Sequence, residues 1–365
     1  MTLQAGIVGL PNVGKSTLFN AITRAGAEAA NYPFCTIDPN VGVVEVPDDR
    51  LEQLATIDHP EKIVPTTFEF VDIAGLVKGA SKGEGLGNQF LAHIREVDAI
   101  IHVVRCFEDN DITHVSGKVD PISDIEIIDM ELIFADMDTV ARRLERVRKQ
   151  LKSGETKVRE EVDALVKADQ ALSNGVPLRR LEWSKEELLL LKPYNLLTIK
   201  PVLYAANVSE DQVAEIDLPL VEVVKEAAAK ENAEVITISA KVESEIAELD
   251  KEDRSEFLKE IGLEESGLDR LIAASYRLLG LITYFTAGPK EVKAWTVRRG
   301  TKAPGAAGVI HSDFEKGFIR AEVIAFDDYV KAGSLNAVKE AGKLRLEGKE
   351  YTVQDGDVMH FRFNV

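Results

Sequence analysis

The stretch that decides the fold is Gly9-Leu10-Pro11-Asn12-Val13-Gly14-Lys15-Ser16-Thr17. It follows the apolar run Gly6-Ile7-Val8, which predicts a buried strand, and precedes apolar residues at helical spacing. Strand, glycine-containing loop and helix form the context in which the pattern G-x-x-x-x-G-K-[ST] binds phosphate. Backbone N–H groups of the loop and the helix N-terminus both attract anions. We therefore predict nucleotide-phosphate contacts from Asn12, Val13, Gly14, Lys15, Ser16 and Thr17, with Lys15 catalytic at the β- and γ-phosphates and Ser16 as a Mg²⁺ ligand.

Composition excludes several classes of protein. The chain has 365 residues, enough for two or three domains, and a formal net charge of -18, which opposes non-specific binding to nucleic acid. Its two cysteines, Cys35 and Cys106, lie far apart and do not form a disulfide framework. No secretory segment and no apolar run of membrane-spanning length is present. We expect a cytoplasmic monomer with no membrane partner.

The order of strand-like and helix-like patterns predicts the domain organisation. Strands are predicted over residues 6–8, 67–72 and 99–104, and again over 201–206 and 234–238, with a helix over 218–232. Between these groups the apolar spacing becomes helical, with a break at Ser153-Gly154. We therefore expect one α/β domain, residues 1–128 and 199–280, interrupted by an antiparallel helical insertion, residues 129–198.

Residues 281–365 form a third block of short strands and glycine turns, with one helix expected over residues 326–341, typical of a small α+β domain.

Two segments are locally basic. Residues 139–159 carry eight Lys or Arg against two Glu, and residues 286–320 carry seven against three acidic residues. These faces are either the two walls of an RNA-binding cleft or solvated surface, and both interpretations stay open at this point. The residues concerned are Arg142, Arg143, Arg146 and Lys149, with Arg298, Arg299 and Lys302.

Two further signals point to a nucleotide that carries a γ-phosphate. Asp72 ends an apolar strand, where a carboxylate holds Mg²⁺ directly or through water, and Gly75 leaves its N–H free for the γ-phosphate. Thr36 lies between the first helix and this strand, the place of a switch threonine that closes over Mg²⁺. Leu76 stands where Ras-type GTPases carry the glutamine that orients water. Efficient hydrolysis therefore requires another water-positioning group.

The base site is expected at the ends of the two later strands. Asn207-Val208-Ser209-Glu210 replaces the usual Asn-Lys-x-Asp of GTPases, and Ser239-Ala240-Lys241 follows the next strand. Glu210 is one methylene longer than the aspartate that accepts guanine's two donors, and Val208 replaces the lysine that covers the base. A site that does not pair guanine's extra donors loses selectivity for guanine. We therefore predict base contacts from Asn207, Val208, Glu210, Ser239 and Ala240.

On these residues the chain resembles the YchF family of Obg-like ATPases, within the translation-factor-related P-loop NTPases. The resemblance extends over nearly the whole chain and includes both departures from ordinary GTPases, at Leu76 and at Val208 to Glu210. It implies ATP in preference to GTP, Mg²⁺, and association with the ribosome, where we expect the large subunit to be the partner. It also implies a coiled-coil arm and a C-terminal TGS domain, a ubiquitin-like β-grasp module that could contact RNA together with the arm.

Three functions remain open: a Mg²⁺-dependent ATPase acting as a nucleotide-gated switch, an ATP-regulated binding module with incidental hydrolysis, and an ordinary translation-related GTPase. His114, in a polar loop after the strand at 99–104, is our candidate for positioning water, or it is an exposed loop residue. His93 is the alternative candidate, although it lies in a predicted helix. Asn12 either helps to hold K⁺ against the phosphates or serves only the turn.

Overall fold

The computed structural model describes residues 3–26, 40–74, 86–109, 118–150 and 156–364. The chain forms two compact units. The first comprises Met1–Val44 and Glu69–Leu271, and the second comprises Glu45–Phe68 and Ile272–Val365. Among the described residues no helix is both long and apolar enough to cross a membrane.

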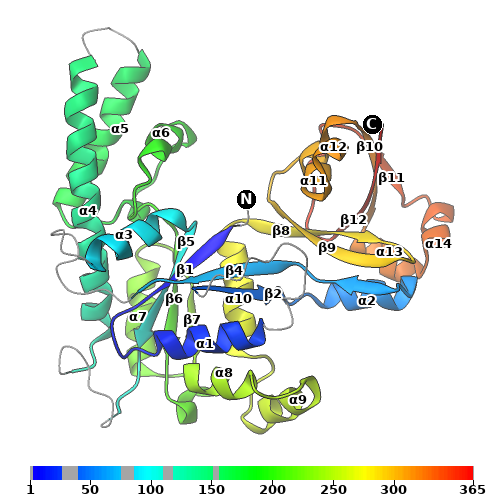
Figure 1. The fold of residues 1–365 in the computed structure, drawn as a ribbon, viewed down its shortest axis with the longest axis horizontal. Coiled ribbons are helices and arrows are strands. Elements are labelled where there is room, and N and C mark those ends of the chain that lie inside the picture. Colours follow the sequence, from blue (N-terminus) through cyan, green and yellow to red (C-terminus); the bar gives the residue numbers. More distant parts are fainter. Residues whose placement is uncertain (1–2, 27–39, 75–85, 110–117, 151–155, 365) are drawn as a thin grey trace. The chain divides into compact units, whose positions relative to one another are not determined.

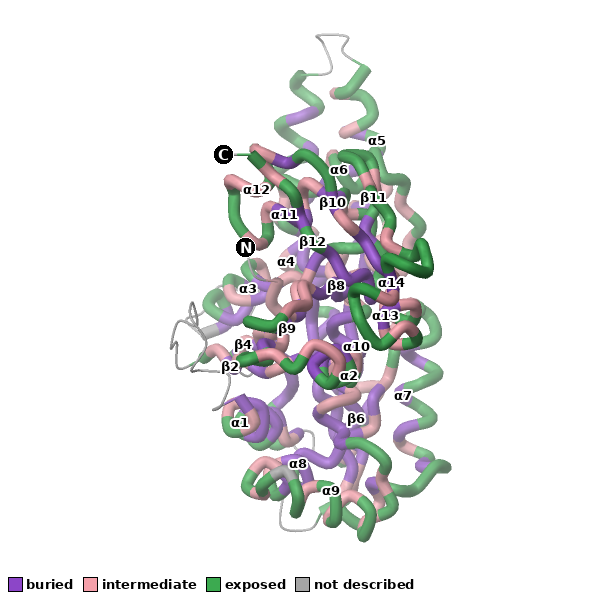
Figure 2. The backbone as a smooth tube through the Cα atoms, turned by 90° about the vertical axis from the view of Figure 1, so that its right-hand side faces the viewer, coloured by how far each residue is buried: buried purple, intermediate pink, exposed green. Residues whose placement is uncertain are grey.

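The first unit is built on a six-stranded sheet in the order β2-β4-β1-β5-β6-β7 (Figure 1). The pairs β1/β4, β1/β5, β5/β6 and β6/β7 are parallel. Every residue of β5 and β6 is buried, as expected for central parallel strands covered on both faces. Figure 2 shows the buried backbone at β6. The strands are β1 (Gln4–Val8), β2 (Val41–Glu45), β4 (Thr67–Asp72), β5 (Ala99–Arg105), β6 (Val202–Asn207) and β7 (Val235–Ile238). The predicted α/β fold class is confirmed.

Helices connect these strands and bury apolar faces against the sheet. α1 begins directly after the glycine loop and packs on β1, whereas α7 packs on β6 and β7. The helices along this part of the chain are α1 (Lys15–Ala25), α3 (Leu86–Glu96), α7 (Pro219–Ala229), α8 (Ala240–Ile246), α9 (Lys251–Glu260) and α10 (Gly267–Leu278). Short 3₁₀ turns are η4 (Leu178–Arg180), η5 (Lys192–Tyr194) and η6 (Glu210–Gln212).

A helical arm is inserted between β5 and β6. It consists of α4 (Pro121–Gln150), α5 (Thr156–Ser173) and α6 (Lys185–Leu191), and α4 packs along α5 (Figure 1). Its core includes Val140, Leu144, Val162 and Leu165, the residues whose spacing predicted helices. α4 begins at Pro121, eight residues before the predicted start, because its first two turns pack against β5 and α7. The predicted break at residues 153–154 lies outside the described residues.

Buried carboxylates tie the arm to the sheet. Asp136 is fully buried in α4 and accepts hydrogen bonds from Leu197 N (2.8 Å), Thr198 N (2.8 Å) and Thr198 Oγ1 (2.7 Å). Burial nevertheless raises the pKa of Asp136. Because these partners lie in the segment that leads back to β6, the carboxylate holds both chain connections of the arm together.

The second unit contains a mixed sheet in the order β11-β10-β12-β8-β9-β3. The pairs β8/β9, β10/β12 and β10/β11 are antiparallel, whereas β8/β12 and β3/β9 are parallel. Its strands are β3 (Lys62–Val64), β8 (Leu281–Ala287), β9 (Glu291–Arg298), β10 (Phe318–Ala325), β11 (Arg345–Glu347) and β12 (Asp357–Phe363). Its helices are α2 (Asp49–Asp58), α11 (Ala303–Ile310), α12 (Ser312–Lys316), α13 (Phe326–Ala332) and α14 (Leu335–Glu340).

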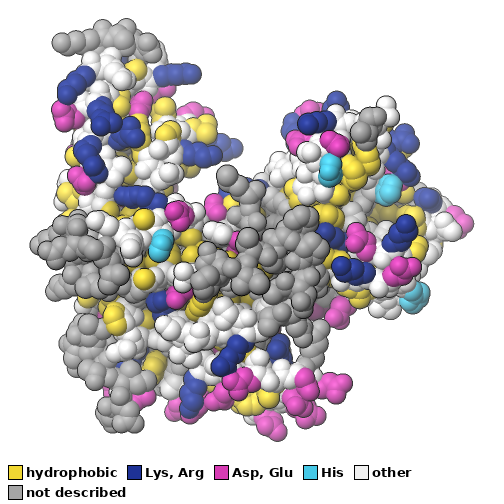
Figure 3. Space-filling model, viewed as in Figure 1, with side chains coloured by type: hydrophobic (Ala, Val, Ile, Leu, Met, Phe, Trp, Pro, Cys, Tyr) yellow, Lys and Arg dark blue, Asp and Glu magenta, His cyan; other side chains and the backbone are white. Residues whose placement is uncertain are grey.

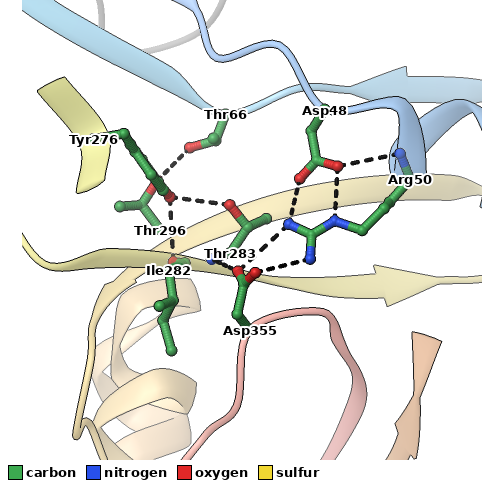
Figure 4. Close-up of polar contacts among 8 residues, drawn as sticks. All are labelled: Asp48, Arg50, Thr66, Tyr276, Ile282, Thr283, Thr296 and Asp355. Atoms are coloured by element: carbon green, nitrogen blue, oxygen red, sulfur yellow. Dashed lines mark hydrogen bonds and ion pairs between the residues drawn. The ribbon is translucent and has the colours of Figure 1, made fainter. Parts of the chain in front are cut away.

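This unit includes a segment from the amino-terminal half of the chain, which differs from the expected start near residue 281. α2 packs on β8 and β9, and β3 pairs with β9. Polar contacts join the same segments in Figure 4. Arg50 contacts Asp48 (2.7 Å) and Asp355 (3.0 Å), and Thr66 Oγ1 lies 2.6 Å from Thr296 Oγ1. A sequence pattern reports local period only, so it did not indicate this long-range pairing.

The single helix predicted over residues 326–341 is wrong, because two short helices occupy this range. α13 ends at Gly333, whose φ of 71° is left-handed. Ser334 then caps α14 by accepting a hydrogen bond from Ala337 N (3.2 Å). Gly333 therefore ends one helix and Ser334 begins the next. The apolar spacing is continuous across both residues, so it did not indicate the break.

Candidate functional site

The glycine loop adopts the backbone that its residue types allow. Asn12 and Gly14 have positive φ values of 64° and 94°, and Lys15 opens α1. A Cβ at Gly9 would lie 2.8 Å from Val13 Cγ2 and 2.9 Å from the Val103 carbonyl oxygen. The loop therefore needs glycine at both ends, once for close packing and once for the left-handed turn.

A cavity of about 390 Å³ lies over this loop, lined by Leu10, Pro11, Asn12, Gly14, Lys15, Ser16 and Thr17. Lys15 is 9% exposed, and its Nζ forms an ion pair with the Asp72 carboxylate at the end of β4. The predicted phosphate lysine and the predicted metal carboxylate are thus adjacent, although β1 and β4 are separated by more than fifty residues in the chain. The Ser16 hydroxyl and the Asp72 carboxylate are both oxygen donors of the kind that Mg²⁺ prefers.

Asn207, at the end of β6, connects the phosphate loop with the 239–241 loop at the end of β7. It is 4% exposed, its Nδ2 donates to the Val13 carbonyl (2.8 Å), and its Oδ1 accepts from Ala240 N (2.9 Å). A Cβ on Gly14 would lie only 2.2 Å from Asn207 Nδ2. One amide side chain therefore fixes two loops that come from the ends of β1 and β7. The structure therefore gives Asn207 a bracing role inside the protein, and its contact with the base stays a prediction.

A second cavity, of about 540 Å³, adjoins the loop on the side of β5, β6 and β7. Its lining includes every predicted base-site residue. The full lining is Asn12, Gly14, Thr17, Phe107, Glu108, Asp109, Asn207, Val208, Ser209, Glu210, Asp211, Ser239, Ala240 and Lys241. Because Asn12, Gly14 and Thr17 line both cavities, the two form one continuous site of a size suited to a nucleotide.

The Glu210 carboxylate of the base loop is not isolated, because it has a cationic partner. Glu210 Oε2 lies 2.6 Å from Lys241 Nζ, with both side chains more than half exposed. The hydrogen bond to Glu210 raises the pKa of Lys241. Val208 is 2% exposed, and its N–H donates to the Ile238 carbonyl (2.9 Å). The cavity therefore has an apolar patch at Val208 beside a carboxylate that already has a cationic partner.

Sequence reasoning missed one wall of this cavity, residues 107–109, and the buried arginine beside it, Arg105. The rule that ligand sites in such sheets lie beyond the carboxyl ends of the strands was applied after this strand only to His114. The chain directly after β5 was therefore a candidate. The predictions concerning Thr36, Gly75, Leu76 and His114 fall outside the described residues. His93 is half-buried in α3, as its predicted helical position indicated.

The strands β4, β1, β5, β6 and β7 are parallel, with the glycine loop at the end of β1, a carboxylate at the end of β4 and a base loop at the end of β6. This arrangement defines a nucleotide-binding protein of the P-loop NTPase class. Family models agree with this class. A model described as a 50S ribosome-binding GTPase matches residues 4–162. A second model, YchF-GTPase_C, described as a protein of unknown function, matches residues 281–364.

Individual relatives are similar to the chain over its full length. It is 64% identical over 366 residues to the ribosome-binding ATPase YchF of Bacillus subtilis strain 168 and 58% identical over 365 residues to that of Escherichia coli O157:H7, with 100% of both chains covered in each case. The solved structure of the Schizosaccharomyces pombe YchF GTPase superimposes with a TM-score of 0.89 at 41% identity, covering 99% of this chain and 98% of the other. The chain belongs to the YchF family.

Proposed function

We propose that this protein is a ribosome-associated, Mg²⁺-dependent ATPase that acts as a nucleotide-gated switch in the cytoplasm. The observation that carries the proposal is the base cavity, where Val208 and the Glu210–Lys241 pair stand beside an intact phosphate loop. The relatives named above as ribosome-binding ATPases support it. The fission-yeast relative is named a GTPase, so base preference is the property to test first.

The expected preference for ATP rests on unpaired polar groups. Guanine presents an N1–H and a 2-amino group that need acceptors, and Glu210 is already engaged by Lys241. Leaving a buried donor unpaired costs about 1–3 kcal/mol, which corresponds to tenfold or more in affinity. Adenine lacks both donors and can lie against the apolar Val208. Calorimetric titration of ATP and GTP tests this, and equal affinities would refute it. The double variant Val208→Lys, Glu210→Asp is expected to shift preference toward GTP.

We propose Ser16, Asp72 and Thr36 as the residues that hold Mg²⁺, which P-loop NTPases generally use to neutralise charge on the phosphates. Lys15 would then exchange its ion pair with Asp72 for contacts with phosphate when nucleotide and metal bind. A K⁺ ion at Asn12 is a separate proposal. Asn12 lines both cavities, and its positive φ is what a simple turn also produces. Turnover in KCl and in NaCl distinguishes the two.

The leucine side chain at position 76 has no polar group, so we propose that His114 positions the attacking water when the ribosome is bound. His114→Ala should lose ribosome-stimulated turnover while ATP affinity is unchanged, and His93→Ala, in α3, serves as the matched control. If His114→Ala keeps full stimulated turnover, His114 has no role in hydrolysis. Turnover that stays low on and off ribosomes, with ATP-dependent ribosome binding retained, would favour the alternative of a binding module.

Basic surface supports the proposed contact with ribosomal RNA of the large subunit. Figure 3 shows Lys and Arg side chains along the arm, where Arg142, Arg143, Arg146 and Lys149 are all exposed on α4. Arg142 and Lys149 each pair with an acidic residue of their own helix, Asp138 at 2.6 Å and Glu145 at 2.8 Å. Such exposed pairs are worth about 0.2–1 kcal/mol and exchange readily for phosphate. Reversing four arm charges should abolish salt-sensitive co-sedimentation with ribosomes.

We also propose that the second unit is a TGS-type β-grasp module and that the arm is a short coiled coil. Three features of the second unit support the first assignment. The central strand order is β9-β8-β12-β10-β11, β8 is parallel to β12, and α11 follows β9 in the chain before β10 begins. Arg298, Arg299 and Lys302 are exposed on this unit. Substituting them should weaken ribosome binding independently of the arm if both faces contact RNA.

A further inference from the structure

Arg105 is the buried charge next to the site that the phosphate and base loops do not explain. It is the last residue of β5, opposite Asn207 at the end of β6, and only 1% exposed. A buried guanidinium is costly unless hydrogen bonds satisfy it. Its contacts with the residues that follow it indicate what it does.

The Arg105 side chain folds back over the residues that follow it. Its Nε donates to the Phe107 carbonyl (3.1 Å) and its Nη2 to the Asp109 carbonyl (3.4 Å). Its guanidinium carbon also lies 4.7 Å from the centre of the Phe107 ring. Two directed hydrogen bonds and a stacked ring specify the backbone path of the turn, because the planar fork must meet both carbonyls at once.

That turn is one wall of the base cavity. Phe107, Glu108 and Asp109 line it on one side, and residues 208–211 with 239–241 line it on the other. The N–H of Cys106 donates to the Asn207 carbonyl (2.8 Å), which fixes the start of the turn beside the base loop. The width of the cavity between the two walls is therefore set by the turn that Arg105 holds.

We propose that Arg105 is a positioning residue for base recognition, holding the 107–109 wall at the correct distance from the Val208–Glu210 wall. The proposal rests on the proposed nucleotide-binding function and deepens it, because it assigns a group that affects the base without touching the phosphates. Lysine cannot replace this role, since a single ammonium cannot reach two carbonyls in a fixed plane and stack on the ring.

The test compares ligands with and without a base. ATP, GTP and inorganic tripolyphosphate are titrated calorimetrically into the full chain carrying Arg105→Lys or Arg105→Met. We expect ATP affinity to fall about tenfold in both variants, while tripolyphosphate affinity stays within twofold of wild type. Arg24→Lys, at a surface arginine that pairs with Glu248, is the matched control and should change neither affinity.

A second variant covers the case in which removing a buried arginine unfolds the unit. Phe107→Leu keeps Arg105 and its carbonyl contacts, and it should also weaken ATP but not tripolyphosphate. The proposal is overturned if Arg105→Lys binds ATP within twofold of wild type, or if tripolyphosphate affinity falls as much as ATP affinity. Failure of the proposed ATP function is a different result, because it is seen in wild type as equal or weaker binding of ATP compared with GTP.

Discussion

Removing the Asn207 side chain should disconnect the phosphate loop from the 239–241 loop that follows β7. Asn207→Ala deletes the donor to the Val13 carbonyl and the acceptor for Ala240 N. Both backbone groups belong to residues at most 2% exposed, so water cannot replace the lost partner without local opening. Each unpaired buried group costs about 1–3 kcal/mol. We therefore expect the loops to separate or loosen, at a total cost of about 2–6 kcal/mol to the closed arrangement.

Two measurements report on the two hydrogen bonds of Asn207 separately: hydrogen exchange on the bond from Ala240 N, and tripolyphosphate affinity on the bond to the Val13 carbonyl. Ala240 is the first residue of α8, where an N–H has no partner within the helix, so its hydrogen exchange depends on Asn207. In Asn207→Ala this amide should exchange much faster, and tripolyphosphate affinity should fall at least tenfold because the Val13 carbonyl is no longer held. Asn207→Asp keeps an acceptor for Ala240 and places a carboxylate against the Val13 carbonyl. It should therefore protect Ala240 yet bind tripolyphosphate as weakly as the alanine variant.

The control is Ser209→Ala, which removes a hydroxyl bonded to Gln212 (2.8 Å) and leaves both hydrogen bonds of the Asn207 side chain in place. It should leave both measurements unchanged. The bracing role is refuted if Asn207→Ala binds tripolyphosphate within twofold of wild type and hydrogen exchange at the Ala240 amide is unchanged.

Three further outcomes are expected. Lys15→Met should weaken nucleotide binding at least tenfold, measured by calorimetry, because a charge-assisted contact to phosphate is lost. Burial raises the pKa of Glu243 from 4.5 to about 7, so the folded chain keeps a proton that the unfolded chain releases. Stability should therefore fall between pH 4.5 and 7, and Glu243→Gln should remove that part of the slope in thermal melts at pH 5.5 and 8. A double-mutant cycle with Arg50→Met and Asp355→Asn should give a coupling of about 1 kcal/mol in chemical unfolding, since the pair is partly exposed. Zero coupling would contradict the interaction drawn in Figure 4.

Local pattern predicted much of the first unit because strands and helices bury one face with a fixed period. The strand over residues 67–72 coincides with β4, and the motif residues around Lys15, Asp72 and Asn207 lie at strand ends that the parallel order brings to one edge. These motif residues lie in or beside adjoining cavities because parallel strands place their carboxyl ends at one edge of the sheet. The alternation of strands and helices in the sequence already implied this parallel order.

The sequence by itself determined the α/β class, the phosphate loop and the order of the motif residues, since each depends on neighbours within a few positions. Only the tertiary structure decided that Glu210 pairs with Lys241, that Arg105 holds the 107–109 wall, and that residues 45–68 join the second sheet. These contacts link positions from two to more than two hundred residues apart. Their partners are chosen by the folded chain's geometry, in which buried charges and strand edges must be satisfied by whatever group the fold brings near.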